Sequence, residues 1–129
     1  MNISKFKKST LSLIIGTVLT LTLACSGQPV AKYENVNFKE LSLKENTIIV
    51  DVRTPEEFNT GHIENSINIP LSVLPDSVES LKKFDAIILV CRSGNRSGKA
   101  KVLLDEKGFK NVYNGGGWDR LNEKLKNEN

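Results

Sequence analysis

Residues that bind metals or form disulfides are scarce in this chain of 129 residues, which has two cysteines and one histidine. A structural zinc site takes about four cysteine or histidine ligands at close spacing, and the chain has no such cluster. We therefore expect no metal site and no cofactor. Internal repeats and long low-complexity tracts are also absent.

The chain also lacks an excess of one charge over most of its length. Its formal net charge of +3 comes entirely from Lys5, Lys7 and Lys8, because fifteen basic and fifteen acidic residues follow from position 25 onward. A nucleic-acid-binding surface is usually strongly basic. The charge balance therefore gives no reason to expect a nucleic-acid partner.

Long apolar runs are missing except near the N-terminus. Residues 11–24 form a run of fourteen, which is shorter than the roughly 20 residues that cross a bilayer as a helix. Three lysines and no acidic residue precede this run, and small residues surround Cys25 at its end. This pattern is typical of an export signal peptide over residues 1–24. A stable N-terminal anchor or a buried helix is the alternative.

The segment around Cys25 resembles a bacterial lipoprotein signal. The resemblance implies cleavage before Cys25, lipidation of that residue, and a domain held at a bacterial membrane, in the periplasm or outside the cell. Thr22 departs from the family, which usually has an aliphatic residue at this place. With Cys25 lipidated, Cys91 is the only free thiol and no intramolecular disulfide can form.

The rest of the chain alternates strand-like and helix-like segments, which indicates the α/β class. Residues 25–35 are polar and contain Pro29, so we expect a tether followed by one domain over residues 36–129. We predict strands at the start of 36–43 and at 47–52, 67–69, 86–90 and 111–113, and helices at 38–41, 55–58, 75–84, 95–107 and 118–126. The three glycines at 115–117 are predicted to form a turn.

The helix at 55–58 has a clear start signal. Thr54 can cap it, Pro55 suits its first position, and Glu56 and Glu57 suit the positive end of the helix dipole. Gly61 can end it.

The loop Cys91–Ser97 has the composition of an anion-binding site. It follows a buried strand and precedes a helix, so its backbone N–H groups and the positive helix end can converge on one point. These N–H groups and the positive helix end would also stabilise a thiolate at the first position of the loop, which makes Cys91 the candidate nucleophile. Arg92 and Arg96 are candidate cationic donors, and Gly94 permits a tight turn. Ser93, Asn95 and Ser97 are expected to supply amides or loop hydrogen bonds.

Less active roles remain open for these residues. Cys91 could be an inert core cysteine, Arg92 a solvated charge, and Arg96 a brace without substrate contact. Asp51 and Arg53 stand at the end of a strand, where a carboxylate usually pairs with a neighbouring arginine, so we expect them to support the site without joining the chemistry.

Four signatures in order resemble a single-domain rhodanese, or sulfurtransferase. They are Asp51-Val52-Arg53 with Glu56-Glu57-Phe58, Gly61-His62-Ile63 with Asn68-Ile69-Pro70, the loop from Cys91 to Ser97, and Asn114 to Trp118. The resemblance implies a roughly five-stranded parallel sheet with helices on both faces, and a persulfide on Cys91 during turnover. It also implies a structural role for His62.

The implied reaction moves a sulfur atom from a small anionic donor to cyanide or a thiol. In the family, a basic residue directly after the cysteine goes with thiosulfate rather than mercaptopyruvate, so Arg92 favours thiosulfate. One alternative is a persulfide carrier that docks on a protein acceptor. Another is a phosphatase or arsenate reductase, but phosphatase relatives place arginine six positions after cysteine, whereas Arg96 lies five positions after Cys91. Nothing in the sequence requires more than a monomer.

Overall fold

The structure, a computed structural model, describes residues 35–127. The predicted signal peptide at 1–24, the lipidated Cys25 and the tether as far as residue 34 lie outside the described residues. Within residues 35–127, no helix is both long enough and apolar enough to cross a membrane.

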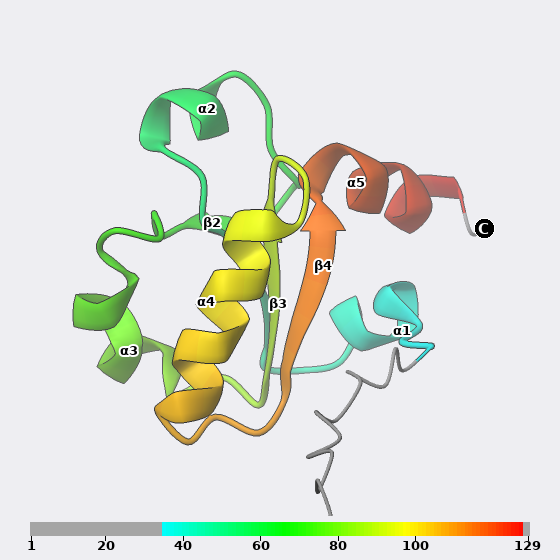
Figure 1. The fold of residues 1–129 in the computed structure, drawn as a ribbon. Coiled ribbons are helices and arrows are strands. Elements are labelled where there is room, and N and C mark those ends of the chain that lie inside the picture. Colours follow the sequence, from blue (N-terminus) through cyan, green and yellow to red (C-terminus); the bar gives the residue numbers. More distant parts are fainter. Residues whose placement is uncertain (1–34, 128–129) are drawn as a thin grey trace, which may run out of the picture. The chain divides into compact units, whose positions relative to one another are not determined.

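A parallel sheet of four strands forms the centre of the domain (Figure 1). The strands are β1 (Thr47–Asp51), β2 (Ile67–Asn68), β3 (Ala86–Cys91) and β4 (Val112–Gly117), in the order β2-β1-β3-β4. Every residue of β3 is buried, as expected for an apolar run that is covered on both faces. The α/β class and the parallel sheet are therefore confirmed.

The number of strands is smaller than expected, because the described residues contain no strand before β1. The chain instead enters α1 (Phe38–Ser42) directly. Asn37 caps this helix, and its side-chain oxygen accepts a hydrogen bond from the Glu40 N–H at 3.1 Å. Because of this capping bond, the residues before α1 form the start of a helix, and the strand predicted there is wrong.

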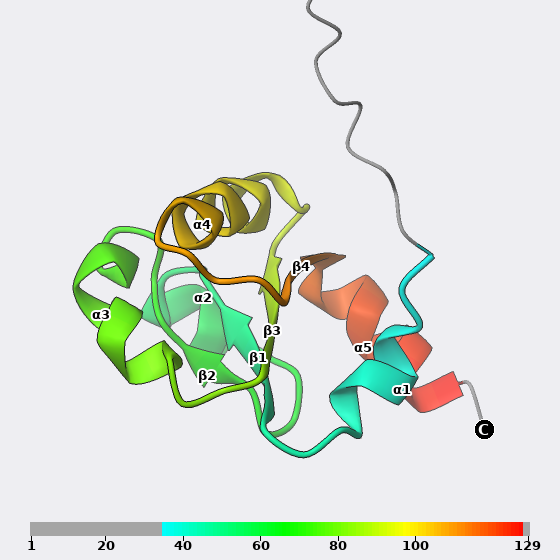
Figure 2. The same cartoon turned by 90° about the horizontal axis from the view of Figure 1, so that it is seen from below.

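Helices cover both faces of the sheet (Figure 2). α3 (Leu74–Leu81) and α4 (Asn95–Glu106) pack on one face, whereas α1 and α5 (Trp118–Asn127) pack on the other. Each face has its own cluster of buried side chains. Cys91 belongs to the cluster under α3 and α4, so its side chain points to that face.

The short helix α2 (Pro55–Asn59) begins where the sequence predicts. Thr54 Oγ1 accepts the Glu57 N–H at 3.3 Å, and the Glu57 carboxylate accepts the Thr54 N–H at 3.1 Å. The two bonds form a capping box, and Pro55 takes the first helical position. α2 lies at the end of the sheet where the strands finish (Figure 1).

β4 is longer than predicted, because it continues through the three glycines instead of turning there. A bulge absorbs Gly115, so that Leu89 pairs with Asn114 whereas Val90 pairs with Gly116. A Cβ atom on Gly115 would lie 3.0 Å from side-chain carbons of Ile88 and Leu121, so a larger residue would require these core side chains to shift. The extension places Gly117 beside Cys91.

The order of the strands places Cys91 where α/β proteins bind ligands. The chain leaves β1 towards β2 on one side and leaves β3 towards β4 on the other. The crevice at the carboxyl ends of two such strands is the usual ligand site of an open α/β sheet. Cys91 is the last residue of β3, and Asp51 is the last residue of β1.

The core under α4 provides a direct test of this packing. We expect Leu104→Ala, at a fully buried position, to lower the free energy of unfolding by about 2–5 kcal/mol, because it leaves a cavity. Val102 on the same helix is 57% exposed, and Val102→Ala should change the value by no more than about 0.5 kcal/mol. Urea denaturation measures both. Equal losses at the two positions would contradict the packing described.

Candidate active site

The Cys91 side chain lies at the floor of the loop that joins β3 to α4. Only 1% of the residue is exposed, and the Gly94 N–H donates a hydrogen bond to its sulfur at 3.1 Å. In Figure 1 the loop stands at the carboxyl end of the sheet, between α2 and the start of α5. Cys91 is therefore held at the end of a rigid strand and enclosed by loop backbone.

Gly94 makes the turn of this loop possible. Its φ of +101° lies in the region that glycine adopts without strain, and a Cβ atom there would lie 3.3 Å from the Gly116 Cα. Gly94 is also the N-cap of α4 and has no side chain to bond the first turn. N–H groups of the loop and of this first turn are therefore available to the sulfur.

Ser97 and Asn114 support the loop from below. The Ser97 hydroxyl lies 3.4 Å from the Cys91 sulfur and 2.7 Å from Asn114 Oδ1. The Asn114 amide donates to the Gly94 carbonyl at 3.1 Å, and its oxygen also accepts the Gly116 N–H. A serine hydroxyl has one proton, so it can donate either to Asn114 or to a thiolate at Cys91. Asn114 keeps the Gly116 bond in either case.

The surroundings of Cys91 favour its charged form. Burial raises the pKa of the thiol, but hydrogen bonds from the Ser97 hydroxyl and from the N–H groups of Ser97, Ser93 and Gly94 lower it by more. The net effect is a pKa below the ordinary thiol value of 9.0. Donors aimed at the sulfur therefore stabilise the nucleophilic thiolate.

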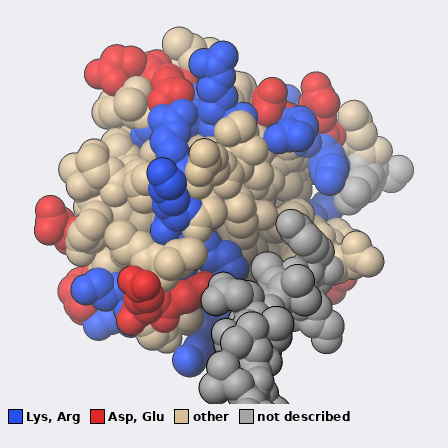
Figure 3. Space-filling model, viewed as in Figure 1, with Lys and Arg blue, Asp and Glu red and all other residues tan. Residues whose placement is uncertain are grey.

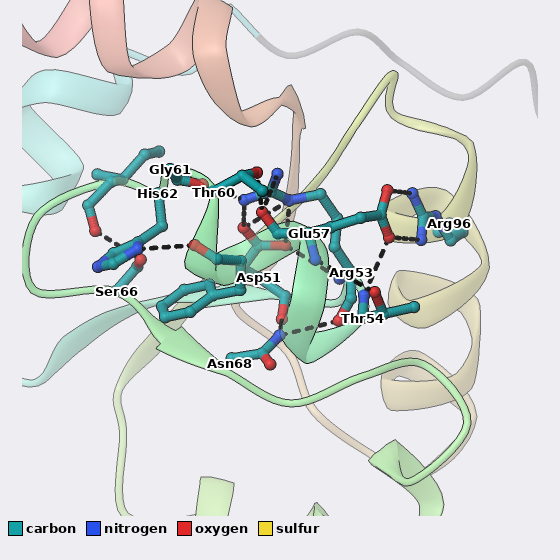
Figure 4. Close-up of polar contacts among 12 residues, drawn as sticks. Asp51, Arg53, Thr54, Glu57, Thr60, Gly61, His62, Ser66, Asn68 and Arg96 are labelled. Carbon is teal, nitrogen blue, oxygen red and sulfur yellow. Dashed lines mark hydrogen bonds and ion pairs between the residues drawn. The ribbon is translucent and has the colours of Figure 1, made fainter.

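Asp51 and Arg53 form a buried ion pair beside the loop (Figure 4). Arg53 Nη2 lies 2.7 Å from Asp51 Oδ2, and the same guanidinium donates to the carbonyls of Glu57 and Gly61. It also lies over the ring of Trp118, 4.6 Å from the ring centroid. The pair thus connects the end of β1 to the middle of α2, to Gly61 just after this helix, and to the first residue of α5.

Arg96 is held by Glu57 of α2 in a two-bond ion pair (Figure 4). Its Nη1 and Nη2 atoms lie 2.6 Å and 2.8 Å from the two carboxylate oxygens. Hydrogen bonds from Arg96 and from the Thr54 N–H lower the pKa of Glu57 to about 2. The Glu57 bond raises the pKa of Arg96, and the neighbouring Cys91 adds to the same effect. Arg96 therefore braces the loop, and the Glu57 carboxylate balances its charge.

Arg92, Ser93 and Asn95 form the exposed upper part of the loop. Among residues 35–127, no acidic side chain pairs with Arg92. Figure 3 shows basic side chains in a column over α4 and the loop before it, and acidic side chains lie mainly to either side. The exposed part of the loop thus carries the positive charge of Arg92.

His62 lies outside the loop. Its ring stacks on Phe58 at 3.9 Å between centroids, and its Nδ1 atom lies 3.0 Å from the Phe58 carbonyl. These contacts fit the structural role that the resemblance implies. No group of three or more histidine, cysteine, aspartate or glutamate side chains suited to a metal ion occurs in the described part of the chain.

The sequence patterns do not predict a role at the site for Glu57 and Asn114, which the structure places in contact with the loop. Glu57 is predicted only as a helix-start acid, although it also binds Arg96, which lies 39 positions away. Asn114 stands out only as the first residue of a family signature. A carboxylate at the third helical position predicts a capping box, but the sequence does not indicate that the same carboxylate also binds Arg96.

The Ser97 hydroxyl allows a test of how the thiolate is stabilised. We expect Ser97→Ala to raise the pKa of Cys91, because the hydroxyl bond that lowers it is lost. The pH dependence of Cys91 alkylation by iodoacetamide, followed on the peptide that contains Cys91, measures this pKa. The wild-type midpoint should lie below 9.0.

Ser93→Ala is the matched control, because Ser93 acts on the sulfur through its backbone N–H, which the substitution keeps. Its midpoint should equal that of the wild type. An unchanged midpoint in Ser97→Ala, or equal shifts in both variants, would contradict the described hydrogen bonds.

Comparison with known proteins agrees with this geometry. Residues 35–124 match the model of the rhodanese-like domain family. The thiosulfate sulfurtransferase PspE of Escherichia coli is 37% identical over 70 residues, which cover 53% of this chain and 67% of that protein.

Solved structures show the same fold. A rhodanese-like domain protein from Staphylococcus aureus superposes with a TM-score of 0.58 at 33% identity, over 66% of this chain and 82% of that chain. A rhodanese with anions from E. coli superposes with a TM-score of 0.53 at 32% identity, over 57% and 88%. Because the family model matches more than half of its length, this chain belongs to the rhodanese-like domain family.

Proposed function

We propose that this protein is a sulfurtransferase that takes the outer sulfur of thiosulfate onto Cys91 and passes it to cyanide or a thiol. One observation carries the proposal: the sulfur of Cys91 is ringed by hydrogen-bond donors that lower its pKa. A nucleophile prepared in this way suits covalent catalysis in two steps.

In the first step, the Cys91 thiolate attacks the outer sulfur of thiosulfate. The sulfur–sulfur bond of thiosulfate breaks, and sulfite leaves with its electron pair. Cys91 then holds a persulfide with one negative charge. In the second step, cyanide attacks the outer persulfide sulfur, thiocyanate leaves, and the thiolate returns. The same donors can hold the negative charge in every stage.

The loop residues have separate tasks in this scheme. N–H groups of Ser93, Gly94 and Ser97 bind the sulfur or persulfide. Arg92 is exposed at the entrance and can bind the oxygens of the donor. Arg96 braces the loop through Glu57, and Asn95 begins α4.

The size of the loop and the relatives support sulfur chemistry over phosphate chemistry. Arg96 lies five positions after Cys91, and its guanidinium is bound to Glu57 instead of facing the loop centre freely. PspE is named a thiosulfate sulfurtransferase, and the similar E. coli structure is described as a rhodanese with anions. A small anionic sulfur donor is therefore the substrate class that we propose.

The proposal includes a location. The basic start, the apolar run and Cys25 support an exported protein that a lipid on Cys25 anchors to a bacterial membrane. The domain would then meet its donor and acceptor in the periplasm or outside the cell, as a monomer and without a nucleic-acid partner.

Steady-state formation of thiocyanate from thiosulfate and cyanide tests this function. We expect Cys91→Ser to reduce turnover to background, because a serine hydroxyl cannot form the persulfide. The wild type should show the parallel double-reciprocal plots of a two-step exchange. Activity retained in Cys91→Ser would contradict the mechanism.

Two further readouts separate the alternatives. Wild-type cleavage of a chromogenic phosphate ester would favour a phosphatase. A persulfide that forms on Cys91 but passes only to a partner protein would favour the carrier.

A further inference from the structure

The chain has four arginines, and the structure divides them into two pairs. Arg53 is bound to Asp51 and Arg96 to Glu57. Arg92 and Arg120 have no ion pair with an acidic side chain among residues 35–127, and both lie at the Cys91 loop. We infer that Arg120 of α5 is an anion-binding residue of the Cys91 site, where it works together with Arg92.

The position of Arg120 follows from the length of β4. Gly117 ends this strand and pairs with Cys91, and α5 begins at the next residue. This connection carries Arg120 back over the loop, where its Nη2 atom lies 3.5 Å from the Ser93 carbonyl. The Ser93 N–H is one of the groups that lower the pKa of Cys91. The guanidinium therefore stands next to the backbone that encloses the sulfur.

Gly117 has no side chain, and this leaves space between the Cys91 loop and the Arg120 side chain. A Cβ atom on Gly117 would lie 3.0 Å from the Arg92 carbonyl oxygen and 3.2 Å from Arg120 Nε. It would also lie 2.9 Å from Asp119 Oδ1. Because glycine fills none of this space, the Arg120 side chain can stay close to the loop.

The charges around Arg120 leave its guanidinium available to a ligand. Asp119 is its nearest acidic neighbour in sequence, but the Asp119 carboxylate accepts a hydrogen bond from the Arg120 backbone N–H, at 2.8 Å. The Arg120 side chain is exposed, and its one hydrogen bond within the described chain is the long one to Ser93. Arg96, in contrast, has two short bonds to Glu57.

The ligand class follows from this chemistry and rests on the proposed function. A guanidinium offers paired N–H donors that match two oxygens of a sulfonate-like or carboxylate group. We assign to Arg120 the oxygens of a small anion whose reacting atom reaches Cys91. Its role is to select anionic reagents over neutral ones, without changing the nucleophile itself.

Alkylation of Cys91 by two reagents tests this role independently of sulfur transfer. Iodoacetate is an anion and iodoacetamide is a neutral reagent of nearly the same size. We expect Arg120→Gln to slow the iodoacetate reaction roughly three- to tenfold, which is the range expected for the net contribution of one typical hydrogen bond. The iodoacetamide rate should stay the same. Rates are measured on the full chain, on the peptide that contains Cys91.

Two variants complete the alkylation experiment. Lys126→Gln removes the same charge from the exposed end of α5 and should leave the ratio of the two rates at the wild-type value. Arg120→Lys keeps the charge but loses the paired donors, so its ratio of the two rates should lie between that of the wild type and that of Arg120→Gln. Equal ratios in Arg120→Gln and wild type, or an equal fall in Lys126→Gln, would overturn the assignment.

Thiosulfate turnover then links this role to the proposed function. Arg120→Gln should raise the KM for thiosulfate roughly three- to tenfold while kcat changes little. A wild type without turnover but with the expected alkylation ratios would reject the thiosulfate proposal and keep the anion site. Turnover with an unchanged KM in Arg120→Gln would reject the anion site alone.

Discussion

The Asp51–Arg53 ion pair is the contact on which the arrangement of the site depends. The carboxylate is fully buried at the end of β1, and the arginine is only 3% exposed. Two charges in such a place need complete hydrogen bonding, and the removal of one partner of a buried pair costs about 3–5 kcal/mol. Arg53 meets this need with the carbonyls of Glu57 and Gly61, which ties the middle of α2 and the residue that follows its C-terminal end to the sheet.

This contact reaches Cys91 through a short series of bonds. Once Arg53 has fixed α2, the Glu57 carboxylate is positioned to bind Arg96, the second residue of α4. Arg96 belongs to the loop that turns over the sulfur, and Asn114 of β4 holds the same loop from the other side. These contacts keep the loop N–H groups directed at the Cys91 sulfur, although no side chain caps α4. Preorganised donors of this kind stabilise charge without reorganising during the reaction.

Local patterns in the sequence predict much of this arrangement. The apolar run at 86–90 predicts a strand that is buried throughout, and Thr54 with Pro55 predicts the start of α2. The polar loop directly after that strand is enough to single out Cys91 as the candidate nucleophile. The strand predicted before α1 is wrong because Asn37 caps a helix there. The turn predicted at 115–117 is also wrong, because Gly116 and Gly117 pair with Val90 and Cys91 and so continue β4 along β3.

Long-range partners cannot be predicted in the same way. The Glu57–Arg96 pair and the approach of Arg120 to Ser93 join residues 39 and 27 positions apart. Neither contact follows from helical or strand spacing, since each depends on how three elements meet at the end of the sheet. Single-sequence patterns therefore find the nucleophile and its loop, whereas the division of the arginines between braces and exposed cations depends on the three-dimensional fold.

The intact mass of the protein before and after thiosulfate, and then after cyanide, tests the central claim most directly. If the donors around Cys91 hold a persulfide, thiosulfate adds the mass of one sulfur atom and cyanide removes it, and Cys91→Ser gains nothing. A reduced wild-type protein that gains no sulfur from thiosulfate, or a Cys91→Ser variant that gains as much as the wild type, would contradict the account.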